Sequence, residues 1–170
     1  MAWVRSEYAG ELAVVSAWLA AVLPWNVTYA SIPGTELSAL FLRFPFLQVR
    51  YIFGLPRDQQ RLFHHPIAAL DLVSGVSETL YYVWIAGAAI VGLAVLLSVA
   101  MYAAEDAVED RSPVHPVRVM GGLLAVATAL LSAATVAIAT NGDFGGGIPI
   151  PIGLAVLGLL AGVLLRADLV

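Results

Sequence analysis

The stretch from Val117 to Thr140 constrains the fold more than any other, because it carries no charged side chain after Arg118. It is long enough to cross the hydrocarbon core of a bilayer, which takes about 20 apolar residues. Small residues recur in it every four positions and so follow one face of a helix: Gly121, Ala125, Ala129, Ala133 and Ala137. We expect a membrane helix whose small-residue face lets a second helix approach closely.

The composition agrees with a membrane protein. Of the 170 residues, 61% are hydrophobic, whereas about half is usual for a soluble domain. The absence of cysteine excludes disulfides, thiolate metal sites and a cysteine nucleophile. The net charge of −4 and the lack of lysine argue against binding nucleic acid through its phosphates. We therefore expect one membrane domain over residues 1–170, with lipid as its surroundings and no nucleic-acid partner.

Three further apolar stretches lead us to expect an all-α fold of four transmembrane helices in a bundle. The predicted helices cover residues 12–32, 80–102, 117–140 and 148–165. The first stretch also has the order of a cleavable signal peptide, but Glu7 and Glu11 favour an uncleaved helix.

Proline and glycine add detail to this scheme. Pro24 is expected to kink the first helix or to end its regular part. Pro149 and Pro151 are expected in the first turn of the last helix, where missing backbone donors cost little. Gly158 and Gly162 form a G-x-x-x-G pair, which is typical of a close helix crossing.

The segment 33–79 is expected to cap the bundle outside the cytoplasm. Its centre, residues 40–54, is aromatic and β-branched enough for strands. Arg43 and Arg50 stand seven residues apart, which also suits an interfacial helix. Pro45 disfavours a continuous helix, so we prefer two short extended segments around it, or an irregular interfacial element.

Aromatic residues beside arginine are typical of the centres of protein interfaces and of segments that lie on a membrane surface. The central block therefore supplies candidate contacts with a protein partner or with lipid. These candidates are Phe41, Arg43, Phe44, Phe46, Arg50, Tyr51 and Phe53.

An even number of helices places both termini on one side of the plasma membrane. Four arginines then share that side and predict that it is cytoplasmic: Arg5, Arg111, Arg118 and Arg166. The four arginines of segment 33–79 count against this orientation, and we give more weight to the short loops. The acidic stretch 103–111 is expected as a helix projecting into water, and residues 141–147 as a tight turn.

The sequence shows no recognisable catalytic chemistry. The predicted helices 80–102, 117–140 and 148–165 have no ionisable residue in their interiors, which argues against a pump, a proton-coupled transporter or a metal-dependent membrane enzyme. His64, His65 and His115 do not have a zinc-site spacing. We expect no catalytic, cofactor-binding or metal-binding residues.

The leading hypothesis is a non-enzymatic structural, adaptor or accessory subunit that has a protein partner or forms a homo-oligomer. One alternative is a transport or channel subunit, in which a path is lined by Asn26, Ser98, Thr128, Ser132 and Thr135. A lesser alternative is a membrane enzyme that acts on lipids through Glu36, Asp71 or His65.

Two stretches carry a family resemblance. Residues 3–11, which lead to Leu23-Pro24-Trp25, and residues 116–122 resemble a family of small uncharacterised haloarchaeal membrane proteins. The resemblance implies a haloarchaeal plasma membrane, with no known activity and no functional residues to carry over. The four-helix plan is also similar in topology to claudin-like bundles, although the paired cysteines usual in their external segment are absent here.

Overall fold

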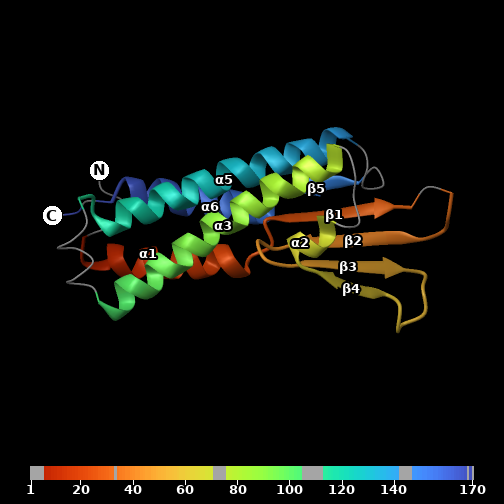
Figure 1. The fold of residues 1–170 in the computed structure, drawn as a ribbon, viewed down its shortest axis with the longest axis horizontal. Helices are drawn as coiled ribbons and strands as arrows, with labels where there is room; N and C mark the ends of the chain where they lie inside the picture. Colours follow the sequence, from red (N-terminus) through yellow and green to blue (C-terminus); the bar gives the residue numbers. More distant parts are fainter. Residues whose placement is uncertain are drawn as a thin grey trace.

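The computed structural model of the chain describes residues 6–32, 34–70, 76–104, 113–141, 147–167 and 169. Long helices lie side by side at one end of the molecule, and a sheet extends beyond their other end (Figure 1). The helices are α1 Ser6–Val22, α2 Pro66–Leu70, α3 Val76–Ala103, α5 Pro116–Asn141 and α6 Ile152–Leu165. The strands are β1 Asn26–Ser31, β2 Ser38–Arg43, β3 Gln48–Phe53, β4 Arg61–His64 and β5 Ile148–Ile150.

The five strands form one antiparallel sheet in the order β4-β3-β2-β1-β5. Four of them follow one another along the chain, and β5 joins β1 from just before α6. Side chains alternate between the two faces of a strand. The inner face, on which α3 and α5 pack, holds the buried residues of β1 and β2. They are Asn26, Thr28 and Ala30 of β1, and Ala39, Phe41 and Arg43 of β2. The other face is called the outer face below.

The expected all-α fold with four transmembrane helices is wrong, because the molecule contains this sheet. Within the described part of the chain, two helices are long and apolar enough to cross a membrane, at Glu78–Ala103 and Pro116–Thr140. Helices α1 and α6 are apolar but have only 17 and 14 residues. A short apolar run fits a buried strand as well as a helix. Two such runs, residues 26–31 and 148–150, form strands because they pair with neighbouring strands.

The errors lie at the start and end of the predicted helices. The first was expected over 12–32, but α1 ends at Val22, just before Pro24, and residues 26–31 pair with β2 as a strand. The last was expected over 148–165, but residues 148–150 form β5 and α6 begins at Ile152. Pro149 is therefore a buried strand residue and not part of a helical turn.

Other expectations agree with the structure. Helices α3 and α5 cover the predicted helices 80–102 and 117–140. Strands β2 and β3 flank Pro45, so the extended alternative is the one that the structure has. Residues 105–111 of the acidic stretch 103–111 and residues 142–146 of the turn 141–147 lie outside the described residues, so the expectations for these two segments lie outside them as well.

Helix α1 packs through alanine. Its buried face consists of Ala9, Ala13, Ala17 and Ala20, each at most 1% exposed. These small side chains allow the close contact with α3, α5 and α6 that builds the core of the helical part. A second core joins the helices to the sheet, and it is formed by Trp25, Leu80, Tyr81, Trp84, Leu131, Ala134, Ile138 and Leu154.

Candidate functional site

A buried polar cluster lies where the inner face of the sheet meets the helices. Arg43 is 1% exposed, and it is opposite Asn26 in the β1–β2 register. One terminal nitrogen of Arg43 donates to Thr28 Oγ1 at 2.8 Å and to Asn26 Oδ1 at 3.1 Å. The Thr28 hydroxyl donates to the same Asn26 oxygen at 2.8 Å. Period-two alternation places all three side chains on one face, so the cluster follows from strand geometry.

Burial changes the acid–base properties of Arg43. Loss of hydration lowers the pKa of Arg43 to about 10, and the nearby Tyr81 opposes this shift. The side chain therefore stays protonated at neutral pH. The cluster places a permanent positive charge in the interior, where charges are stabilised by hydrogen bonds and neighbouring dipoles.

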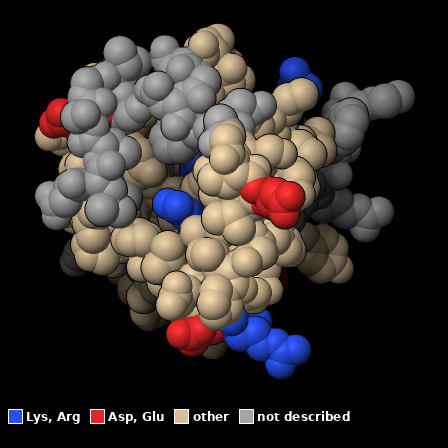
Figure 2. Space-filling model, turned by 90° about the vertical axis from the view of Figure 1, so that its right-hand side faces the viewer, with Lys and Arg blue, Asp and Glu red and all other residues tan. Residues whose placement is uncertain are grey.

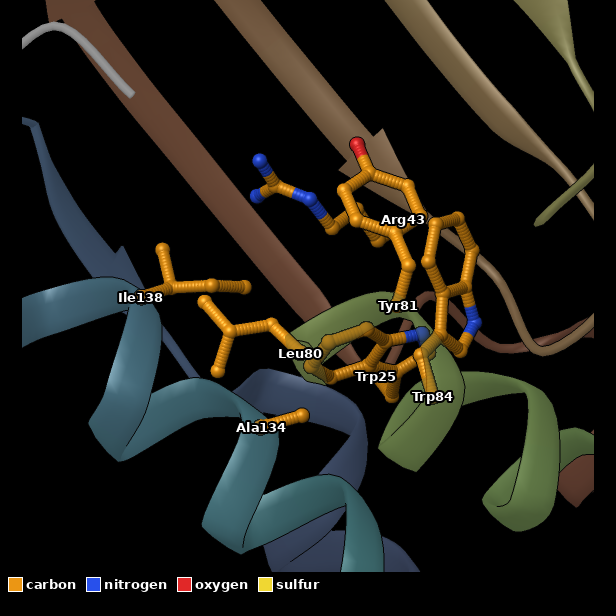
Figure 3. A pocket seen from close by; sticks show the side chains of 7 residues that line it. All are labelled: Trp25, Arg43, Leu80, Tyr81, Trp84, Ala134 and Ile138. Carbon is orange, nitrogen blue, oxygen red and sulfur yellow. The ribbon is translucent and has the colours of Figure 1, made fainter. Parts of the chain in front are cut away.

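The ends of α3 and α5 cover this cluster. The Asn26 amide donates to Thr135 Oγ1 of α5 at 3.4 Å, and the Tyr81 hydroxyl of α3 donates to Gln48 Oε1 at 3.5 Å. Trp25 and Trp84 pack beside Tyr81 with Arg43 nearby (Figure 3). The cavity among these side chains measures about 10 Å³, which is close to the least space that a single water needs. The junction is therefore tightly packed and has no room for an organic ligand.

Arg50 is a second cation on the inner face. It is opposite Phe41 in the β2–β3 register and is half-buried. The guanidinium carbons of Arg50 and Arg43 lie 5.7 and 5.0 Å from the centre of the Phe41 ring, within the range of cation–π attraction. Viewed from the sheet end, a basic group is recessed in a hollow among uncharged side chains (Figure 2).

The outer face of the sheet is apolar, and none of its residues is buried. Residues that lie directly opposite each other on paired strands point to the same face. The pairing therefore assigns the following residues to the outer face: Val27, Tyr29, Ser31, Ser38, Leu40, Leu42, Val49, Tyr51, Phe53, Arg61, Phe63, Ile148 and Ile150. Tyr29, Phe63 and Ile148 are 57%, 61% and 82% exposed. The aromatic rings of Tyr29, Phe53 and Tyr51 contact one another across the strands. Large exposed apolar patches are typical of interaction surfaces.

The family model of a family of unknown function, DUF7549, matches residues 2–169. The chain belongs to the DUF7549 family. No curated protein matches it. Membership therefore agrees with the expectation of an uncharacterised family, and any function of this DUF7549 chain must be argued from its own residues.

The predicted contact residues of the DUF7549 chain are divided between the inner face of the sheet, its outer face and the turn between β2 and β3. Phe41, Arg43 and Arg50 lie on the inner face, with Phe41 and Arg43 buried, while Tyr51 and Phe53 lie on the outer face. Phe44 and Phe46 belong to the turn between β2 and β3. The carbonyl of Phe44 accepts hydrogen bonds, and the ring of Phe46 is 46% exposed and lies over α3 near Gly92.

The predicted packing residues are also divided. A Cβ atom at Gly121 would lie 3.0 Å from Leu165 Cγ, so α5 and α6 cross closely there. Ala125 and Ala137 are half-buried against the two cores, whereas Ala129 and Ala133 are exposed. A Cβ at Gly158 would meet Thr128 at 3.6 Å, and one at Gly162 would meet nothing within 4 Å.

Sequence reasoning did not identify Asn26 and Thr28 as partners of Arg43. The alternation of polar and apolar residues over 26–31 was a usable signal, since Asn26, Thr28 and Ala30 share one face of a strand. It also did not identify the alanine face of α1, although Ala9, Ala13 and Ala17 have helical spacing.

Three of the polar residues suggested for a channel path have partners within their own helices. The hydroxyls of Ser98, Thr128 and Thr135 donate to carbonyls of the preceding helical turn, as serine and threonine hydroxyls inside helices can do. Among the described residues there is no group of three or more His, Asp or Glu side chains that could hold a metal ion.

Proposed function

We propose that the chain is a non-enzymatic integral membrane protein that acts as an adaptor or accessory subunit. In this proposal α3 and α5 cross the bilayer, and the outer face of the sheet binds another protein in the water on one side. The observation that carries the proposal is the outer face itself. Apolar side chains run across its five strands, and none of its residues is buried.

The exposure of the helices supports a membrane location. Only 33% of the 18-residue apolar window of α3, and 33% of that of α5, is buried, whereas a core helix of a soluble protein is mostly buried. Large apolar side chains with exposures of 49% to 71% point away from the helices, namely Leu93, Leu96, Val126, Val136 and Leu159. Residues 79–104 and 119–142 contain no charged side chain. Such an apolar surface is stable in contact with lipid, whereas its exposure to water costs free energy.

The proposed orientation places the sheet outside the cell. Helix α1 begins and α6 ends at the end of the molecule away from the sheet (Figure 1). Arg118 near the start of α5 and Arg166 after α6 supply positive charge at that end, which favours the cytoplasmic side. The sequence resemblance of residues 3–11 adds a haloarchaeal plasma membrane to this proposal.

The chemistry of the outer face favours a different protein over a second copy of this chain. Arg61 is its one charged residue, and its guanidinium carbon lies 6.0 Å from the centre of the Tyr51 ring. A second copy would offer the same face, with a cation and no acid. The expected partner therefore has an apolar centre with an acidic residue opposite Arg61, because aromatic side chains and arginine dominate the energy of such interfaces.

The partner is tested by native mass spectrometry of the full chain, gently solubilised from its own membrane at high salt. Phe63→Asp places a charge in the outer face, and Ile67→Asp is the matched control on α2, where the side chain is 65% exposed. We expect a second protein in fixed ratio with the wild type and with Ile67→Asp, and its loss with Phe63→Asp. A wild type that is monomeric, or a Phe63→Asp variant that keeps the partner, would contradict the proposal.

The membrane location is tested separately by cysteine labelling, which needs no background removal because the chain has no cysteine. Glu36→Cys lies in the turn after β1 and Pro113→Cys lies before α5, and both positions are exposed. An impermeant maleimide applied to intact cells should label Glu36→Cys alone. Labelling of Pro113→Cys alone would reverse the orientation, and extraction of the chain by alkaline carbonate would refute membrane insertion.

A further inference from the structure

An apolar groove lies on the side of the helical part, between the end of α1 and the middle of α3. Its volume is about 590 Å³. Its walls come from three segments that are far apart in the sequence: residues 18–22 of α1, residues 89–96 of α3, and Phe46 in the turn between β2 and β3. Helix α3 runs obliquely past α1 (Figure 1), and the groove lies between their exposed sides.

Gly92 keeps this groove open. Among the described residues, a Cβ atom at Gly92 would meet only the ring of Phe46, at 3.9 Å. Gly87 of the same helix differs, because a Cβ there would lie 2.8 Å from the side chain of Leu131 on α5. Gly87 therefore allows two helices of this chain to pack closely, whereas Gly92 leaves free space beside the Phe46 ring.

The lining of the groove selects a hydrocarbon occupant. None of the described side chains that line it carries a charge, and the indole N–H of Trp18 is the one hydrogen-bonding group among them. A polar ligand would lose hydration in this groove without gaining hydrogen bonds in return. The rings of Trp18 and Phe46 are half-exposed, so an apolar occupant can contact both.

The groove opens onto the surface that the proposed function assigns to lipid. Leu93 and Leu96 line it and are exposed, and both lie within the candidate span Glu78–Ala103. A molecule that enters the groove from the side therefore comes from within the bilayer. The hydrocarbon available there is a lipid chain or the side chains of a transmembrane helix of another protein.

The size of the groove favours the lipid chain. A helix with its side chains is about 10–12 Å across and rises 5.4 Å per turn, so one turn occupies roughly 400–600 Å³. The whole groove has about the volume of a single turn, whereas a spanning helix of about 20 residues has more than five turns. A partner helix could therefore insert only a few side chains, while a flexible hydrocarbon chain can lie in the groove along its length.

We propose that this groove binds one hydrocarbon chain of a membrane lipid, which lies over Gly92 and between the rings of Trp18 and Phe46. The chain gains dispersion contacts with three fixed walls, and fluid lipid does not offer contacts of that density. Phe46 belongs to the sheet and Trp18 to α1, so the bound chain also contacts both sides of the junction between them. The proposal rests on the proposed membrane location and not on the outer face of the sheet.

The site is tested by fluorescence quenching in the full chain, solubilised in a mild detergent. A phosphatidylcholine with brominated acyl chains is added at increasing mole fraction in the micelle, because bromine quenches an indole ring on close contact. Trp25 and Trp84 are buried, and a Trp18→Phe variant measures the background of the other tryptophans. We expect quenching of Trp18 that saturates at low mole fraction. Quenching in simple proportion to the mole fraction would show ordinary surface contact and would overturn the proposal.

Two glycine variants separate the groove from the general lipid-facing surface. Gly92→Leu should raise the half-saturating mole fraction about tenfold, because the leucine side chain occupies the space that the lipid chain would fill. Gly162→Leu is the matched control on α6, where a Cβ would meet nothing within 4 Å, and it should titrate as the wild type. If Gly92→Leu does not fold, Ala89→Leu, at an exposed position of the lining, takes its place. Equal half-saturation in the wild type and the filled variant would refute the site.

Failure of this site is distinguishable from failure of the proposed function. A chain that resists alkaline carbonate but shows only proportional quenching loses the lipid site and keeps its membrane location. Native mass spectrometry of the same variants tests the other occupant. Loss of the second protein with Gly92→Leu, but not with Gly162→Leu, would assign the groove to the partner and overturn the lipid assignment.

Discussion

Trp25 and Trp84 donate their indole N–H groups to the same acceptor, the carbonyl oxygen of Phe44, each at 3.2 Å. Their rings lie 5.8 Å apart at 58°, and both side chains are buried. Trp25 precedes β1, Trp84 belongs to α3, and Phe44 follows β2. This shared carbonyl therefore ties the sheet to the helices at the point where the chain leaves α1.

Trp84→Phe should destabilise the chain by roughly 1–3 kcal/mol, because it removes a buried hydrogen bond and leaves unfilled volume. The Phe44 carbonyl keeps its bond from Trp25, so the loss is smaller than for removal of both donors. Thermal unfolding in one membrane mimetic measures it. Trp18→Phe is the control, since Trp18 is half-exposed on α1, and an equal cost for both variants would show that the shared carbonyl is unimportant.

Asn26→Leu should cost more than Thr28→Val. The Asn26 Oδ1 atom accepts from both Arg43 and Thr28, so its removal takes an acceptor from two buried donors, one of them charged. We expect about 3 kcal/mol for Asn26→Leu and about 1–2 kcal/mol for Thr28→Val from denaturant unfolding. Thr140→Val, at an exposed hydroxyl of α5, should change the free energy of unfolding little. A larger loss of unfolding free energy for Thr28→Val than for Asn26→Leu would contradict the assigned hydrogen bonds.

The contribution of Arg43 to stability should not depend on pH in the neutral range. Burial lowers the pKa of Arg43 to about 10, so the unfolded chain binds more protons at this site only above about pH 9, and stability rises with pH there. Between about pH 6 and pH 9 both states keep the proton. The difference in unfolding free energy between wild type and Arg43→Met should therefore be constant over that range, and a steady drift would show that another titrating group is coupled to Arg43.

Gly153→Ala should destabilise the chain, whereas Gly162→Ala should not. A Cβ at Gly153 would lie 2.9 Å from the Trp25 Cα and would overlap the backbone of Pro24, which cannot move aside easily. Such crowding costs about 1–3 kcal/mol. At Gly162 nothing lies within 4 Å of the added atom, so the gain in helix propensity of up to about 1 kcal/mol should remain. Equal melting temperatures of the two variants would contradict the close packing of α6 on Pro24 and Trp25, just before β1.

Much of the helical part could be predicted from the sequence. The long stretches without charged residues predict α3 and α5, because a long apolar run without helix-breaking residues satisfies its backbone hydrogen bonds best as a helix. The strands around Pro45 could also be predicted, since proline stops a helix and the flanking residues are aromatic or β-branched. The candidate site could be predicted only in part. The sequence analysis named Arg43 and Arg50, but it assigned them to a surface that contacts a partner or lipid and not to the inner face of the sheet.

The sequence by itself determined where the long apolar helices run, and that the chain has no thiol and few charges. Only the tertiary structure decided the states of residues 26–31 and 148–150. These short apolar runs become strands because β1 finds β2 on one side and β5 on the other. Val27 and Ile150 are paired although more than 120 residues separate them, and no local pattern contains such a pairing. The same pairing sets which face each side chain joins, and so it buries Arg43 and leaves Phe63 exposed.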